Sequence, residues 1–190
     1  RSGRVWTVIN GVKSSVPFLD ISDEVGAWGD FGMHGFCLDP NFTNNGHVYL
    51  FYTVDHHHLM NFGKPGYNPN TNEYFMGSIG RITRYTAHAT NGFQTINYGS
   101  RLVLVGESRS NGIPTVHMSH GMGSLVFGQD GTLLASSGDG ASYATVDTGG
   151  AVGGSYYLQC LNEGIIRTKE NVGAFRAQLV DSLNGKILRI

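Results

Sequence analysis

The sequence predicts an all-β protein, and its composition, its segmentation and an internal repeat all support this fold class. Glycine accounts for 28 of the 190 residues and charged residues for only 14%, against average usages of roughly 7% and 25%. A helix bundle avoids glycine and needs charged helix formers in bulk. Hydrophobic residues make up 40%, which is sufficient for a globular core.

Alternating apolar segments are bounded throughout by Gly, Asn, Asp and Pro, which is the pattern of short strands. The first two flank an Asn10-Gly11 pair of the kind that favours hairpin turns. Only Asn171–Leu183 has a weakly helical pattern. The predicted strands are Arg4–Ile9, Pro17–Ile21, Gly35–Leu38, His47–Val54, Gly80–Thr86, Arg101–Gly106, Ser124–Gly128, Thr132–Ser136 and Gly185–Ile190.

These strands repeat along the chain. The pair within Gly35–Val54 matches the pair within Ser124–Ser136, and each pair is followed by a strand of one pattern, GRITRY from Gly80 and GKILRI from Gly185. A repeated four-stranded antiparallel unit is typical of a β-propeller blade. We expect Gly35–Leu38 and Ser124–Gly128 to be inner strands, each forming a hairpin with the strand that follows.

The repeat also predicts incompleteness. Residues 1–190 contain about two blades and strands of a neighbouring blade, whereas a propeller needs at least about four blades. We therefore expect the chain to be the N-terminal part of a single β-propeller domain that needs the rest of its own propeller. An unpaired strand such as Gly185–Ile190 would be an aggregation edge, so the chain alone should be poorly soluble or oligomeric.

Charge and hydropathy exclude several functions. The formal charge is −1 and the isoelectric point about 6.8, which gives no electrostatic reason to bind nucleic acid. No apolar run approaches the roughly 18 residues of a membrane span.

Two cysteines, Cys37 and Cys160, are too few for a disulfide framework. A buried free thiol is the simpler interpretation of Cys37, and pairing with Cys160 stays open.

Three segments carry residues capable of chemistry. In VHMSHGMG, His117 and His120 precede an inner strand, and a histidine there can act as a general base or only hydrogen-bond within its loop. The run His56–His58 is interpreted as a surface loop rather than a metal site. In SSGDGASY, Asp139 suits a turn better than a calcium site, although a carboxylate there could ligate calcium.

Four segments, in order, resemble the soluble quinoprotein glucose dehydrogenase family. They are GMHGFCLDPNFTNNGHVYLFYTV, GRITRYT, SHGMGSLVFGQDGTLLASSGD and DSLNGKILRI. The resemblance implies a six-bladed propeller that holds pyrroloquinoline quinone (PQQ) near calcium. It also implies oxidation of the C1 hydroxyl of an aldose sugar, an electron acceptor as partner, and a secreted or periplasmic location.

Carried over by motif, His120 is the catalytic histidine and Asp30 lies where family enzymes place a cofactor-contacting Gln. That replacement, together with Ser124 in place of an Arg, departs from the family pattern. The metal ligands are not assigned, since the family's calcium loop would follow residue 190. The alternative implied by these departures is a non-catalytic propeller that binds carbohydrate or protein.

Overall fold

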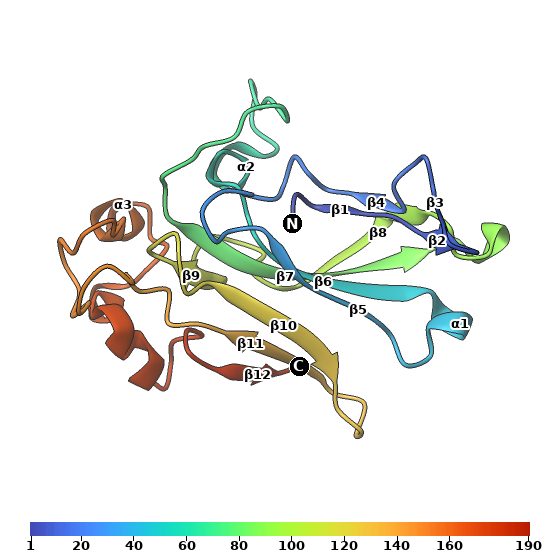
Figure 1. Ribbon diagram of the computed structural model, residues 1–190. Coiled ribbons are helices and arrows are strands. Elements are labelled where there is room, and N and C mark those ends of the chain that lie inside the picture. Colours follow the sequence, from blue (N-terminus) through green and yellow to red (C-terminus); the bar gives the residue numbers. More distant parts are fainter.

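The computed structural model describes residues 1–190 as two antiparallel sheets that pack on each other (Figure 1). In the larger sheet the order is β5-β6-β7-β8, and β9 pairs with one end of β7; in the smaller it is β10-β11-β12. The larger sheet contains β5 (Met33–Leu38), β6 (His47–Thr53), β7 (Ser78–Ala87), β8 (Ile96–Val105) and β9 (Ile113–Thr115). The smaller sheet contains β10 (Met122–Phe127), β11 (Leu133–Ser137) and β12 (Ile187–Arg189).

Both predicted hairpins are confirmed. Phe36 of β5 lies opposite Leu50 of β6, and Leu125 of β10 lies opposite Ala135 of β11. The all-β class is confirmed as well, since sheet predominates and the helices are short. The two sheets form an open pair rather than a closed ring. The short strand β9 was not predicted.

The N-terminal segment contributes two small ladders. β1 (Arg4–Val5) pairs with β4 (Leu19–Asp20), and β2 (Val8–Ile9) pairs with β3 (Val12–Lys13). Asn10 and Gly11 both have positive φ, 51° and 78°, as a tight hairpin turn requires. The predicted turn is therefore correct, whereas Arg4–Ile9 is divided between two ladders instead of forming one strand.

Strand β6 is buried on both faces, and this places the core. Successive side chains of a strand point to opposite faces. Phe51 packs toward the smaller sheet, with Leu125 and Leu133. Leu50 and Tyr52 pack toward the N-terminal segment, in a second apolar cluster that includes Leu19 and Val25. The N-terminal segment thus covers the face of the larger sheet that the smaller sheet leaves open.

Close contact between the sheets depends on Gly35 of β5. A Cβ atom at this position would lie 2.8 Å from Cβ of Phe51 and 2.9 Å from Cγ of Leu125. Distances this short require the neighbours to move, so only glycine fits without rearrangement. Gly35 thereby determines how near β10 approaches β5.

A buried ionic cluster joins the N-terminal segment to the larger sheet. The carboxylate of Glu24 accepts hydrogen bonds from Arg81 at 2.6 Å, from Arg101 at 2.7 Å and from the hydroxyl of Tyr52. Burial alone would raise the pKa of Glu24, but the two guanidinium groups outweigh it and hold the pKa below its ordinary value. The N-terminal segment is therefore attached through charge as well as through apolar packing.

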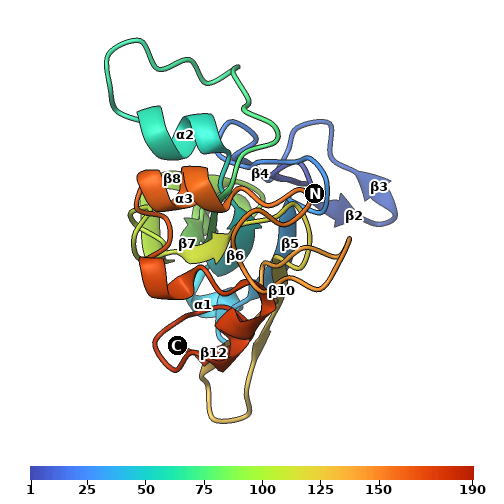
Figure 2. The ribbon, with the colours of Figure 1, turned by 90° about the vertical axis from the view of Figure 1, so that its left-hand side faces the viewer.

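Short helices lie in the connections and at one end of the molecule, which Figure 2 views directly. None of them is long and apolar enough to cross a membrane. Within the predicted helical segment Asn171–Leu183, the helix that forms is of the 3-10 type, and α3 was not predicted. The helical elements are α1 (Phe42–Asn45), α2 (His56–Asn61), η1 (Ala89–Asn91), α3 (Tyr157–Asn162), η2 (Thr168–Glu170) and η3 (Gly173–Gln178).

The prediction of a surface loop over His56–His58 is wrong. These residues begin helix α2, and His56 and His58 are buried. The reason lies one residue earlier, because the side chain of Asp55 accepts hydrogen bonds from the backbone N–H groups of His57 and His58. Such an N-cap satisfies donors that a helix start leaves free.

Candidate active site

The connections that lead into β5 and β10 meet at an open groove of about 430 Å³. Asp30 and His120, the two residues predicted from the sequence, both line it. Asp30 is fixed through its backbone, whose N–H donates to the carbonyl of Met118 at 2.9 Å. The groove is lined by Asp30, His34, His120, Gly121, Met122, Gly123, Ser136, Ser137 and Gly138.

His120 is held in an uncommon backbone conformation. Its φ of 54° lies in the left-handed region that non-glycine residues rarely adopt. Its carbonyl accepts a hydrogen bond from the N–H of Gly140 at 2.8 Å, and 46% of its side chain is exposed. The backbone is thus pinned while the imidazole faces the groove.

Asp139 completes this arrangement, whereas the sequence favoured a turn over a calcium site at this residue. The turn is present, because Oδ1 of Asp139 accepts the N–H of Ala141 at 2.9 Å. The same oxygen lies 3.1 Å from Nδ1 of His120. The spacing of 19 residues carries no local signal, so only the pairing of β10 with β11 brings these two residues together.

The contact with Asp139 determines what the imidazole can do. A carboxylate only accepts hydrogen bonds, so Nδ1 of His120 must carry a proton to donate to it. In the neutral ring Nε2 is then unprotonated and holds a lone pair. A carboxylate behind a histidine also stabilises the imidazolium that forms when Nε2 takes up a proton. This contact therefore leaves Nε2 as the ring nitrogen that is able to accept a proton.

His117 has a different environment. It is buried, and its Nδ1 lies 2.7 Å from the hydroxyl of Ser119. Its ring meets that of Tyr143 edge-on, with 5.5 Å between centroids. Burial lowers the pKa of His117, which favours the neutral ring. These contacts give His117 a packing role outside the groove.

The floor of the groove is made of small residues. Gly121, Gly123 and Gly138 carry no side chain, and Ser136 and Ser137 add only hydroxymethyl groups. A Cβ at Gly121 would meet nothing closer than 3.8 Å, so the space above it is open. No Lys or Arg lines the groove.

The remaining sequence candidates are placed as follows. His56 hydrogen-bonds to Glu73 and to Glu163, which links α2 to α3. The structure contains no group of three or more His, Cys, Asp or Glu side chains arranged to hold a metal ion. Cys37 and Cys160 are both free thiols, with Cys160 buried and Cys37 half-buried.

Comparison with known sequences gives a distant relative. No family model matches the chain. The HIPL1 protein of Arabidopsis thaliana is 26% identical over 145 residues, which are 70% of this chain and 21% of that protein.

Comparison with solved structures gives a consistent fold. The PQQ-bound form of the aldose sugar dehydrogenase from Streptomyces coelicolor matches with a TM-score of 0.58 at 19% identity. A putative oxidoreductase (glucose dehydrogenase) from Thermus thermophilus matches with a TM-score of 0.59 at 21% identity. The apo-form of the soluble aldose sugar dehydrogenase from Escherichia coli matches with a TM-score of 0.55 at 18% identity. Each match covers 100% of this chain and 38% of the other.

The resemblance predicted from the sequence is therefore confirmed at the level of the fold. This chain has the fold of part of the sugar dehydrogenases, over its full length. It spans 38% of the length of those enzymes, so the activity of a whole protein does not follow from the match alone.

Proposed function

We propose that this chain belongs to the soluble quinoprotein sugar dehydrogenases and contributes the general base to a PQQ-dependent oxidation of an aldose at C1. The observation that carries the proposal is His120, oriented by Asp139 in a groove that Asp30 also lines. The choice of cofactor and substrate class follows the similarity in fold to a PQQ-bound aldose sugar dehydrogenase.

In the proposed reaction, Nε2 of His120 accepts the proton of the C1 hydroxyl as the C1–H bond breaks. PQQ, when bound, supplies the acceptor for the hydride. The sugar loses one proton and one hydride and becomes the lactone. Asp139 keeps the lone pair of Nε2 directed at the groove and stabilises the charge that the ring gains. Base catalysis of this kind contributes about 10²–10⁴-fold in rate.

The groove suggests how the cofactor would be held. Gly121 and Gly123 would leave room for the cofactor, and Asp30 and His120 would be available to contact it. The side chains that neutralise the cofactor's carboxylates and hold calcium would come from outside this groove. In this proposal residues 1–190 are the N-terminal part of a six-bladed propeller, which acts on a sugar in a secreted or periplasmic setting and passes electrons to a separate acceptor.

The direct test is His120→Ala in the whole protein, reconstituted with PQQ and calcium and assayed on a panel of aldoses with an artificial electron acceptor. We expect kcat to fall by about 10²–10⁴-fold. The midpoint of thermal unfolding should hardly change, because about half of the His120 side chain is exposed. The matched control is His88→Ala, which replaces an exposed histidine distant in sequence from the groove.

Two outcomes would contradict the proposal. Equal turnover by parent and variant, with PQQ bound in both, would remove His120 from the mechanism. A parent that binds sugars but oxidises no aldose would support the alternative of a non-catalytic carbohydrate-binding propeller.

A further inference from the structure

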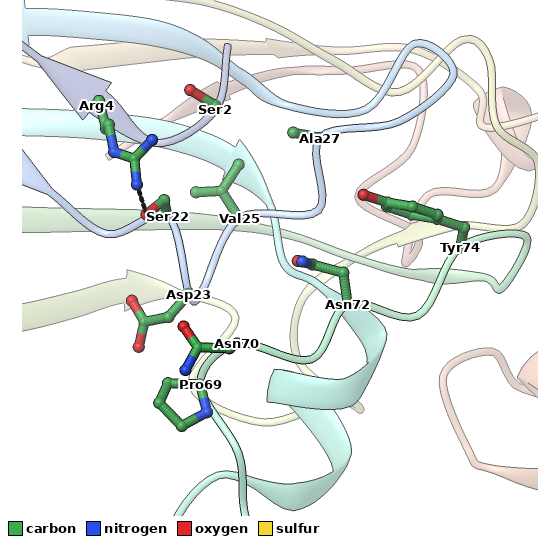
Figure 3. Close-up of a pocket in the computed structure, with 10 residues that line it drawn as sticks. All are labelled: Ser2, Arg4, Ser22, Asp23, Val25, Ala27, Pro69, Asn70, Asn72 and Tyr74. Atoms are coloured by element: carbon green, nitrogen blue, oxygen red, sulfur yellow. Dashed lines mark hydrogen bonds between the residues drawn. The ribbon is translucent and has the colours of Figure 1, made fainter.

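A second depression of about 380 Å³ shares no lining residue with the groove at His120. It lies between the N-terminal segment, the turn from Ser22 to Ala27, and residues 69–74 of the connection between β6 and β7 (Figure 3). Small-molecule clefts typically measure about 300–1,000 Å³. This depression is therefore large enough for a small ligand.

Pro69 lines this depression, and from residue 70 to residue 74 every second residue does so. Asn70, Asn72 and Tyr74 line it, whereas Thr71 and Glu73 do not. A period of two is the geometry of an extended chain. Glu73 is engaged elsewhere, by His56. One side of the segment thus presents two amides and a phenol to the same space.

The polar groups that line the depression are largely unused by the protein. Among the ten lining residues the only hydrogen bond joins Arg4 to Ser22 (Figure 3). Asp23, Asn70 and Asn72 line the depression (Figure 3), and their side chains make no hydrogen bond within the protein. An amide offers two donors and two acceptor sites, and a carboxylate offers acceptors only. Such a set matches the hydroxyl groups of a ligand.

Charge and shape narrow the class of ligand. The lining contains one cation, Arg4, which is also paired with Asp20 at 2.8 Å, and one anion, Asp23, so it favours neither a cationic nor an anionic ligand. The floor is formed by the small side chains of Val25 and Ala27. The ring of Tyr74, about half exposed, packs 6.3 Å from the indole of Trp28, measured between centroids. A supported aromatic ring suits the apolar face of a sugar.

We propose that this depression is a binding site for a neutral saccharide unit, separate from the oxidation site. The amides of Asn70 and Asn72 and the carboxylate of Asp23 bond its hydroxyl groups, and the ring of Tyr74 packs against its C–H face. The site would hold a glycan without reacting with it.

The test uses methyl glycosides, which lack a free C1 hydroxyl and so cannot be oxidised at C1. Methyl glucoside, methyl mannoside, methyl galactoside and methyl N-acetylglucosaminide are each titrated into the whole protein by calorimetry and by ligand-observed NMR. At least one should bind. The double substitution Asn70→Ala and Asn72→Ala should weaken that binding by about tenfold or more.

Matched variants separate the contributions. Thr71→Ala, on the opposite side of the same segment, should bind like the parent. Tyr74→Phe should keep most of the binding and Tyr74→Ala should lose it, because the ring rather than the hydroxyl makes the apolar contact. His120→Ala should bind methyl glycosides normally, so failure of the oxidation proposal leaves this result untouched.

Three outcomes would overturn the site. The first is a parent that binds none of the four glycosides. The second is binding that survives the double substitution at Asn70 and Asn72. The third is calcium binding that the double substitution abolishes while no glycoside binds, which would assign the depression to a cation instead.

Discussion

At the scale of single residues, Asp139 does two things with one oxygen. Oδ1 closes the turn at Ala141 and faces Nδ1 of His120. The first contact fixes where the carboxylate lies, and the second fixes which ring nitrogen of His120 carries the proton. Backbone geometry and proton placement at the groove are therefore coupled through this one side chain.

Asp139→Asn should separate these two roles. The amide oxygen of Asn can still accept the N–H of Ala141, so the fold should persist, but the negative charge behind His120 is lost. We expect kcat on an aldose to fall by at least about 10–100-fold, the loss typical when the hydrogen-bond partner of a metal-bound histidine is replaced, with little change in KM. Nitrogen-15 NMR of His120 reads the protonated nitrogen directly. An unchanged ring spectrum together with unchanged kcat would show that Asp139 only closes a turn.

Glu24 provides a prediction on acid stability. Its pKa is lower in the folded chain than the ordinary 4.5, so its stabilising effect is present above that value and is lost as the pH falls below it. Glu24→Gln should cost about 3 kcal/mol near pH 7, because Arg81 is left buried without its partner charge. The difference in free energy of unfolding between parent and variant should shrink below about pH 4.5. Urea unfolding of both proteins from pH 7 to below pH 4.5 measures this difference. A difference that stays constant over the range would show that the charge of Glu24 does not stabilise the fold.

At the scale of elements, the packing of β5 against β10 depends on Gly35, which has no side chain to separate the two strands. Gly35→Ala would place a methyl group within 3 Å of both Phe51 and Leu125. Overpacking of this kind usually costs about 1–3 kcal/mol. Chemical denaturation should show that the free energy of unfolding falls by this amount. In the control Gly153→Ala the added Cβ meets nothing within 4 Å, so the free energy of unfolding should hardly change. Equal stability of the two variants would mean that the sheets adjust freely.

How far the sequence determines each element depends on how local the determining contacts are. The hairpins β5-β6 and β10-β11 were predictable because alternation and turn residues act over a few positions. Helix α2 could have been predicted as well, since Asp55 is an N-cap residue, but adjacent histidines suggested a loop. Strand β9 forms only because β7 offers it a partner about 35 residues earlier. The same reasoning applies to the site: His120 lies in a recognisable segment, whereas its contact with Asp139 requires the folded sheet.

At the scale of the whole molecule, the two sheets expose unpaired edges. β12 pairs only with β11, and Ile187 on it is 74% exposed. An edge strand with apolar side chains is a template for pairing with another chain. In the proposed propeller this edge would be covered by the next strand of the same blade.

The 190-residue chain alone should therefore self-associate. Sedimentation velocity at several concentrations should show oligomers that grow with concentration. Ile187→Lys should reduce them, because a lysine on an edge strand opposes pairing. A compact, cooperatively melting monomer of the unmodified chain would contradict this prediction. The control is Val180→Lys, which adds the same charge at an exposed position outside the strands.

The ionic cluster at Glu24 also has a consequence for the order of assembly. Its partner Arg101 lies 77 residues later in the chain, and synthesis proceeds at roughly 5–20 residues per second. A ribosome therefore makes Glu24 about 4–15 s before it makes Arg101. During that interval at most one of the two guanidinium groups, that of Arg81, exists to offset the desolvation of the Glu24 carboxylate. The first twenty-odd residues should thus dock late on a nascent chain, after β8 has been made, although they are the first to leave the ribosome.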